Sequence, residues 1–318
     1  MKAEESFQNY TENDAPLAEF CITTPIDCGG LRLDQALARL LPQYSRARLT
    51  LWVREGRVTV DQKPCTPRDK LHGGERLVVK PALTPAETAY RPESIDLNIV
   101  FEDETLIVLN KPAGLVVHPG TGNWHGTLLN ALLAHAPQLH NVPRAGIVHR
   151  LDKDTSGLLV VAKTLTAQTD LVRQLQARSV SREYRAVAHG HVRRNGTYEG
   201  PIGRDPRSRV RMAVVGSGKP AITHYSIVEL LPRATVLACK LETGRTHQIR
   251  VHLQKLGHPI WGDPVYGPRQ GPIAPLFPRQ ALHAERLALN HPEHGELMQW
   301  QAPLPADMRE LIASLRLA

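Results

Sequence analysis

The sequence predicts an α+β protein of about two domains, in which a small α/β module precedes a larger body built on a mixed or antiparallel β-sheet. The chain has 318 residues, of which 42% are hydrophobic and 22% charged. These values are typical of a chain that buries a core, and they exclude a disordered or fibrous protein. In the larger part, strand-like runs outnumber helical periods and do not alternate strictly with them, which favours the α+β class.

Charge divides the chain into three segments. Residues 1–27 hold one basic and six acidic residues and are predicted to form an acidic flexible tail. Residues 28–82 hold 11 basic and 5 acidic residues, and the remaining 236 residues hold 27 and 20. Two positive segments fit a polyanionic partner, although solubility alone would also explain the charge. From charge alone, RNA, DNA and neither remain about equally open.

Residues 28–82 are predicted as a module with the order helix–helix–strand–strand. Apolar residues recur at helical spacing in its first part, and Ser45 is the predicted N-cap of a second helix that carries Arg46 and Arg48. A strand, a turn and a second strand are expected after it, at 58–60, 61–63 and 76–80. The segments GLRLDQAL, YSRARLTLWVREGRVTV and GGERLVV resemble the S4 RNA-binding domain, with Asp-Gln where its hairpin usually has Asn-Gly. The resemblance implies that Arg46 and Arg48 contact RNA.

The rest of the chain is predicted as a linker and one larger domain. Residues 81–98 hold three prolines in a polar stretch. Residues 83–98 are therefore the expected linker, and residues 99–318 form the second domain. Strands are expected at 99–101, 105–109, 115–117, 158–161, 184–188, 221–228 and 235–241. Helices are expected at 127–135, 166–178 and 246–256.

Several classes of protein lack support in the sequence. The longest apolar runs are about five residues and the N-terminus is acidic, so a membrane or secreted protein is not expected. The four cysteines form no CxxC pair, which is typical of reduced thiols in the cytoplasm, and the histidine pairs lack metal-ligand spacing. Neither GxxxxGK[ST] nor GxGxxG occurs. No metal and no cofactor are therefore expected, and the predicted localisation is cytoplasmic.

The segment 146–157 is the first candidate for chemistry. It is a polar loop that carries Asp152, Asp154, two flanking cations and a Thr-Ser-Gly turn, and it leads into an apolar strand. Loops that a rigid sheet positions often carry function, and a carboxylate beside Arg150 and Lys153 is expected to stay ionised, as a nucleophile requires. Ordinary turn chemistry would explain the same residues.

Two further segments combine aromatic, basic and turn residues. Residues 181–185 place Tyr184 between cations at the start of a strand, which suits stacking of a base beside a phosphate backbone but also an ordinary half-buried tyrosine. Residues 243–252 enter a helix through a Gly-Arg-Thr turn, and Arg250 is expected one turn beyond His247 on the same face. A solvated basic helix face would explain this pattern as well.

Taken in order, these segments resemble the RluA-type pseudouridine synthases. The resemblance runs from about residue 99 to 310 and rests on HRLDKDTSG, REYRAV, TGRTHQIRVH and GHPIWGDPVYG. Within the family, the match is to bacterial members that modify the RNA of the large ribosomal subunit. The resemblance implies a pseudouridine synthase fold and an isomerase that acts on uridine in 23S rRNA, in the stem-loop called helix 69.

The resemblance also implies roles for individual residues. Asp152 would attack the ribose C1′ or the base, Tyr184 would stack on the flipped uracil, and Arg250 would pair with Asp152. Arg150 would fill the gap left by the extruded nucleotide. Asp154 is not the implied catalyst, since other members lack an aspartate there. Further residues of the same motifs are predicted to bind substrate: His149, Leu151, Thr155, Arg245 and His247.

Other functions remain open beside this one. A family member that acts on another rRNA or tRNA site would have the same motifs, and so would a non-catalytic RNA-binding factor in ribosome assembly. A retaining glycosidase is a poor second, because it needs one carboxyl group held protonated. The expected partner is 23S rRNA or the assembling large subunit, with no membrane and no protein partner, and the expected state is a monomer.

Overall fold

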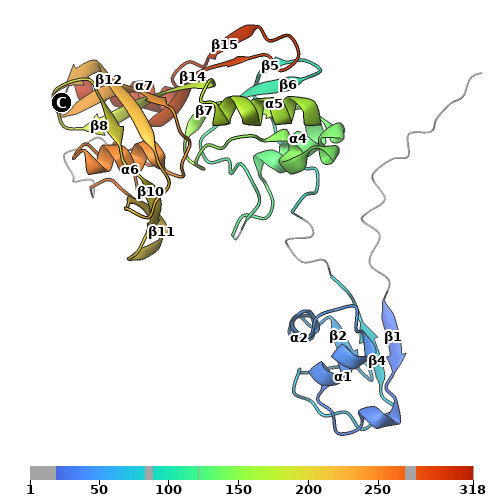
Figure 1. Cartoon of the computed structure of the whole chain (residues 1–318). Coiled ribbons are helices and arrows are strands. Elements are labelled where there is room, and N and C mark those ends of the chain that lie inside the picture. Colours follow the sequence, from blue (N-terminus) through green and yellow to red (C-terminus); the bar gives the residue numbers. More distant parts are fainter. Residues whose placement is uncertain (1–18, 83–88, 121, 269–276, 318) are drawn as a thin grey trace, which may run out of the picture. The chain divides into compact units, whose positions relative to one another are not determined.

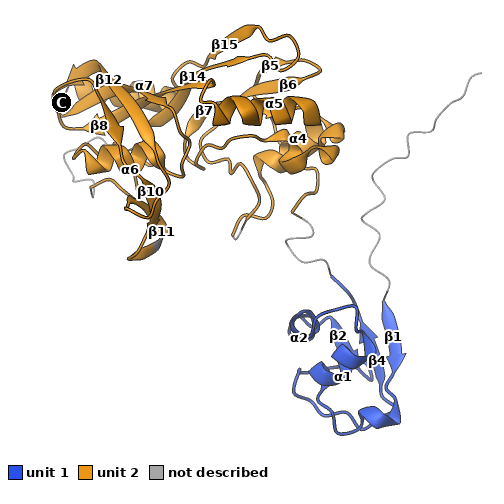
Figure 2. Cartoon of the chain, viewed as in Figure 1, with its two compact units in different colours: residues 1–84 blue, residues 85–318 orange. Residues whose placement is uncertain are grey.

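The computed structural model describes residues 19–82, 89–120, 122–268 and 277–317. The chain divides into two compact units, residues 1–84 and 85–318 (Figure 2). Each unit has a hydrophobic core of its own and is described here by itself. Among the described helices, none has the length and apolarity that a membrane crossing requires.

The first unit packs two helices on a small antiparallel sheet. The helices are α1 (Leu33–Leu40) and α2 (Arg46–Arg54), and the Ser45 hydroxyl accepts a hydrogen bond from the backbone N–H of Arg48 as the N-cap of α2. The sheet order is β1-β4-β2-β3, with the bounds β1 Phe20–Thr23, β2 Val58–Val60, β3 Lys63–Pro64 and β4 Arg76–Val79. Asp61 and Gln62 both have positive φ, at 48° and 63°. This is the conformation of a tight hairpin turn, so Asp-Gln fills the place of the usual Asn-Gly.

The expected tail of residues 1–27 is too long. Residues 1–18 lie outside the described residues, but Phe20–Thr23 form β1, which pairs with β4, and a short 3₁₀ turn follows at Ile26–Cys28. Phe20 and Ile22 alternate with exposed residues and pack on the core of this unit. The alternation spans only four residues of an acidic segment, so the sequence did not predict this strand.

The expected linker of residues 83–98 is also only partly a linker. Residues 83–88 lie outside the described residues, whereas residues 89–98 pack on the second unit without forming a helix or strand. The amide nitrogen of Asn130 donates to the backbone carbonyls of Ala89 and Arg91, at 2.9 and 2.8 Å, and Ala89 is buried. Proline and polar composition indicated a connection here, but did not reveal these hydrogen bonds.

The second unit is built on a nine-stranded mixed sheet, which confirms the α+β class (Figure 1). The order along the sheet is β5-β6-β7-β14-β8-β13-β12-β9, with β15 paired to β14. All these pairs are antiparallel except β7 with β14. The bounds are β5 Ile99–Glu102, β6 Leu106–Lys111, β7 Ser156–Ala162, β8 Ser181–His189, β9 Gly196–Glu199, β12 Ile222–Leu231, β13 Ala234–Leu241, β14 Leu282–Asn290 and β15 Leu297–Gln301.

Helices and a separate hairpin complete the unit. The helices are α4 (Leu128–His135), α5 (Leu165–Gln176), α6 (Gln248–Lys255) and α7 (Ala306–Leu317). The hairpin of β10 (Ile202–Asp205) and β11 (Ser208–Val214) contacts α6 and projects below it in Figure 1. Residues 115–117, expected as a strand, contribute only the isolated bridge of Val116 with Thr127. The strands β9, β10, β11, β14 and β15 and helix α7 were not predicted, because they are short or mix apolar with charged residues.

The middle of the sheet is buried on both faces. Along β6, Ile107 and Leu109 belong to the core cluster that includes α4, whereas Leu106 and Val108 face the cluster that includes α5. Along β7 every residue is buried. A strand that is covered on both sides offers a rigid base, and the loop at residues 147–155 enters the sheet through it.

Candidate active site

The loop that precedes β7 is held at several points. Lys111, fully buried at the end of β6, donates from Nζ to the backbone carbonyls of Pro112, Leu115 and Lys153, at 2.7 to 2.9 Å. Burial lowers the pKa of Lys111 to about 7, although the nearby acidic side chains oppose this shift. The hydroxyl of Thr155 accepts a hydrogen bond from Gln280 at 3.1 Å. These contacts fix the loop directly after Asp152.

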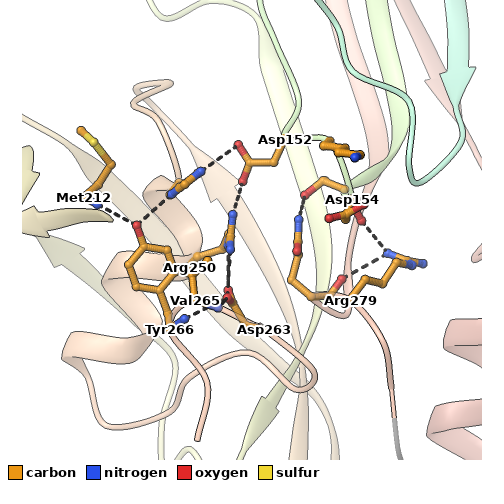
Figure 3. Close-up of polar contacts among 12 residues, drawn as sticks. Asp152, Asp154, Met212, Arg250, Asp263, Val265, Tyr266 and Arg279 are labelled. Atoms are coloured by element: carbon orange, nitrogen blue, oxygen red, sulfur yellow. Dashed lines mark hydrogen bonds and ion pairs between the residues drawn. The ribbon is translucent and has the colours of Figure 1, made fainter. Parts of the chain in front are cut away.

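Asp152 lies at the wall of a cavity of about 850 Å³. Arg250 Nη1 donates to Asp152 Oδ2 at 3.0 Å, and His247 Nε2 lies 3.9 Å from Oδ1 (Figure 3). The side chain of Asp152 is 16% exposed, so the carboxylate is held yet accessible from the cavity. Among the described residues, neither Arg150 nor Lys153 pairs with it. The partner is Arg250, from a helix 98 residues further along the chain, which is the pairing that the resemblance implied.

Arg250 is itself clamped between two carboxylates. Its Nε and Nη2 donate to Asp263 at 2.6 and 2.9 Å, while Nη1 reaches Asp152. Burial would lower the pKa of Arg250, but Asp263 and Asp152 more than offset this and raise it. Burial would raise the pKa of Asp263, but Arg250 and the N–H groups of Tyr266 and Val265 hold it below its usual range. The guanidinium therefore stays charged and fixed, as a partner that orients a carboxylate must.

Asp263 and Tyr266 are site residues to which the sequence analysis assigned no role. Both residues lie in the segment GDPVYG, which supported the resemblance as a whole motif without a role for either residue. The Tyr266 hydroxyl accepts from the backbone N–H of Met212 in β11 and lies 2.8 Å from His247 Nδ1. The hairpin, Tyr266 and His247 thus form a polar chain that ends at Asp152 (Figure 3).

Tyr184 lies on β8 and lines the same cavity. Its side chain is buried, with 6% exposure. Burial raises the pKa of Tyr184, Asp152 raises it further, and only Arg182 opposes the shift. Near neutral pH the side chain is therefore a phenol, a flat and mostly apolar surface beside the carboxylate.

The structure brings most of the other predicted site residues to this cavity. They are Arg150, His149, Leu151, Thr155, Arg245 and His247. His149 accepts a hydrogen bond at Nε2 from the backbone N–H of Val160, and burial together with Arg182 lowers its pKa to about 3. It is therefore a neutral brace between the loop and β7. Arg245 Nε donates to the carbonyl of Pro220.

The arrangement of His247 and Arg250 differs from the predicted one. Helix α6 begins at Gln248, because His247 is its N-cap residue in the left-handed conformation, with φ 58°. The two side chains converge on Asp152 for this reason, and not because they share a helix face. Burial lowers the pKa of His247, although Asp152 opposes this shift.

Arg46 and Arg48 belong to the first unit and make contacts within it. Arg46 Nη2 pairs with the buried carboxylate of Asp34 at 2.7 Å. The Arg48 guanidinium lies over the rings of Tyr44 and Trp52, about 5 Å from each centroid. Their role in RNA binding stays a prediction. Within the described ranges, no cluster of three or more His, Cys, Asp or Glu side chains could hold a metal ion.

Comparison with known proteins identifies both units. Residues 105–255 match the family model described as RNA pseudouridylate synthase, and residues 31–77 match the S4 domain. The chain is 56% identical over 300 residues to ribosomal large subunit pseudouridine synthase D of Nitrosomonas europaea, covering 93% of this chain and 87% of that protein. It is 53% identical to the protein of the same name from Pseudomonas aeruginosa, covering 92% and 94%.

A solved structure has the same fold in the second unit. The human protein RNA pseudouridylate synthase domain containing 1 superposes with a TM-score of 0.55 and 29% identity, over 71% of this chain and 97% of that one. The sequence relatives cover nearly the full length of the chain, and the family model spans both the loop with Asp152 and the helix with Arg250. The chain therefore belongs to the RNA pseudouridylate synthase family, isomerases of uridine in RNA, and carries an S4 domain in its first unit.

Proposed function

We propose that this protein isomerises uridine to pseudouridine in 23S rRNA of the large ribosomal subunit, in the helix 69 stem-loop, with Asp152 as the nucleophile. The names of its relatives, which act on the large ribosomal subunit, support the substrate. The observation that carries the chemistry is the carboxylate of Asp152 at the cavity wall, held at 3.0 Å by an arginine that Asp263 clamps from behind. The S4 domain supports an RNA partner.

The reaction needs a base that has left its helix, because the reacting atoms are inaccessible in a stacked duplex. Asp152 attacks C1′ of the ribose and the N1–C1′ bond breaks, so that its electron pair stays on uracil. The freed uracil rotates, C5 bonds to C1′, and Asp152 leaves. The C5 proton is then lost and N1 gains one, so atoms balance without an external reactant.

The surrounding residues have distinct proposed roles in this sequence. Arg250 fixes the orientation of the attacking carboxylate. Tyr184 offers its ring for stacking while the uracil is detached, which keeps the base in the cavity. Arg150, exposed at the cavity mouth, is proposed to occupy the place of the extruded nucleotide. The proposed setting is the cytoplasm, with the chain acting as a monomer and without a protein partner.

The test is tritium release from 5-tritiated uridine in 23S rRNA, with tRNA as the alternative substrate. The expected result is release from rRNA only, abolished in Asp152→Asn protein that still binds RNA. Asp154→Asn is the matched control, because this neighbouring carboxylate has no assigned role, and it should keep its activity. Release from tRNA instead would overturn the substrate. Tight binding without release from either RNA would favour the non-catalytic assembly factor.

A further inference from the structure

Arg182 is a buried cation in the cavity wall to which the proposed chemistry gives no task. It lies on β8, two residues before Tyr184 and on the same face, and it is 7% exposed. In the described part of the chain its guanidinium has no carboxylate partner. Its one hydrogen bond there runs from Nη2 to the backbone carbonyl of Glu242 at 3.5 Å, and Nε has no hydrogen-bond partner.

The surroundings of Arg182 do not compensate its charge. The carboxylate of Glu242 is already engaged by Arg178 at 2.6 Å and by His224 at 2.7 Å. Burial lowers the pKa of Arg182, as expected of a cation removed from water. A buried charge without a counter-ion is destabilising, and Arg250 in the same cavity shows the usual solution with two carboxylates. The free protein thus keeps an unfavourable cation facing an open cavity.

A second feature, the turn before α6, lies next to the Arg182 guanidinium. The turn passes close to Arg182, since a Cβ on Gly244 would lie 2.8 Å from Nη1. Within the described residues, the backbone N–H groups of Gly244 and Thr246 donate to no acceptor. They precede the N-terminus of α6, where the helix dipole also favours an anion.

We propose that Arg182 and the turn Gly244–Thr246 bind a phosphate group of the RNA backbone next to the extruded uridine. A planar guanidinium and nearby N–H groups can bind a tetrahedral anion, and a phosphate neutralises the cation, which uracil cannot do. Side chains two residues apart on a strand stand roughly 7 Å apart on one face. A nucleotide whose phosphate lies at Arg182 can therefore place its base over Tyr184. The proposal rests on the proposed function in taking RNA as the ligand.

The test measures RNA affinity and thermal stability of the full chain in the Asp152→Asn background, with and without Arg182→Met. The RNA carries a neutral methylphosphonate at one phosphate at a time around the modified uridine. We expect Arg182→Met to weaken binding about tenfold or more and to raise the melting temperature, because it removes an uncompensated buried charge. At one position the methylphosphonate should weaken binding by a similar factor, and this effect should vanish in Arg182→Met.

Arg178→Met is the matched control, since Arg178 lines the same cavity but is paired with Glu242. It should leave the methylphosphonate effect intact and should not raise the melting temperature. A methylphosphonate effect that persists in Arg182→Met at every position would overturn the phosphate site, and so would a lower melting temperature. Tritium release by the wild-type chain is scored separately. Its absence together with a phosphate effect specific to Arg182 would refute the isomerase and keep the site.

Discussion

At the scale of residues, the chemistry of the site depends on the pairing of its charged side chains. Arg250 lies between Asp152 and Asp263, and the second carboxylate is completely buried behind it. A lone arginine on a helix could swing between conformers, whereas one clamped by a bidentate pair presents its remaining nitrogen in one direction. The motif QIR pointed to Arg250 from the sequence, but Asp263 became a site residue only through its contact.

Asp263→Asn should therefore lower both stability and activity. The asparagine cannot neutralise Arg250, and breaking a buried pair from one side costs about 3 kcal/mol. We expect urea unfolding to show that loss and tritium release to slow, because Arg250 no longer holds Asp152 in place. Glu229→Gln is the control, since its pair with Arg316 lies at the surface, and it should change neither quantity. Wild-type stability in Asp263→Asn would contradict this account.

The acid side of the stability profile should depend on His149. Burial and Arg182 lower its pKa in the native state to about 3, whereas an unfolded histidine titrates near about 6.5. Between these values the native state binds fewer protons than the unfolded one, so stability falls as the pH drops from about 6.5 toward 3. His149→Gln keeps an acceptor for the Val160 N–H but does not titrate. Its unfolding free energy should fall less steeply in that window.

His118 contributes to the same acid limb. Burial, Arg150 and Arg144 lower its pKa to about 4. The limb should therefore shrink in His149→Gln but not disappear. Urea unfolding at a series of pH values measures this, and an identical slope in both proteins would exclude His149 as a source.

At the scale of elements, the parallel pair β7–β14 is the decisive contact. It joins strands far apart in the chain, and it aligns Ser156 with His283 and Gly157 with Ala284. The pair lies directly after the loop that carries Asp152. Strand β7 was predictable from its continuous apolar run. Strand β14 was not, because histidine, glutamate and arginine interrupt its alternation and only the buried neighbours decide its conformation.

Gly157→Ala should disrupt this pair. The residue has φ +116°, and a Cβ would lie 2.3 Å from the carbonyl oxygen of Ala284, a contact that forces the strands apart. Gly114→Ala is the matched control, because Gly114 also has positive φ, +88°, but an added Cβ there would lie in open space. We expect the control to cost about 1 kcal/mol of unfolding free energy and Gly157→Ala about 3 kcal/mol or more. Equal losses would show that steric contact across β7–β14 contributes nothing.

At the scale of the whole molecule, charge and domain order indicate that both units bind the same polyanion. The segment 28–82 has six more basic than acidic residues. Within it, Arg46 already neutralises Asp34, so its removal would affect the first unit as well as any RNA contact. Removal of the whole first unit therefore tests its role in RNA binding more directly than substitution of one arginine.

Deleting residues 1–84 should leave the second unit folded, since that unit has its own core, and should weaken RNA binding. For every RNA phosphate that the first unit neutralises, the deletion should reduce the slope of log affinity against log salt by about 0.7–0.9. Affinities measured over a series of salt concentrations give this slope, and thermal unfolding checks that the shortened protein is folded. An unchanged slope would mean that the first unit neutralises no phosphates.

The sequence alone determined the order of the two units, the α+β class and the motifs around Asp152, Tyr184 and Arg250. It could do so because helical spacing, apolar runs and turn residues are local properties, and because the motifs are contiguous. The tertiary structure decided which charges meet. Asp263 clamps Arg250 from behind, a contact that no motif predicted, and within the described residues Arg182 keeps no counter-ion. Such pairings depend on strands and helices that come together from distant parts of the chain, and no local sequence pattern encodes which of them meet.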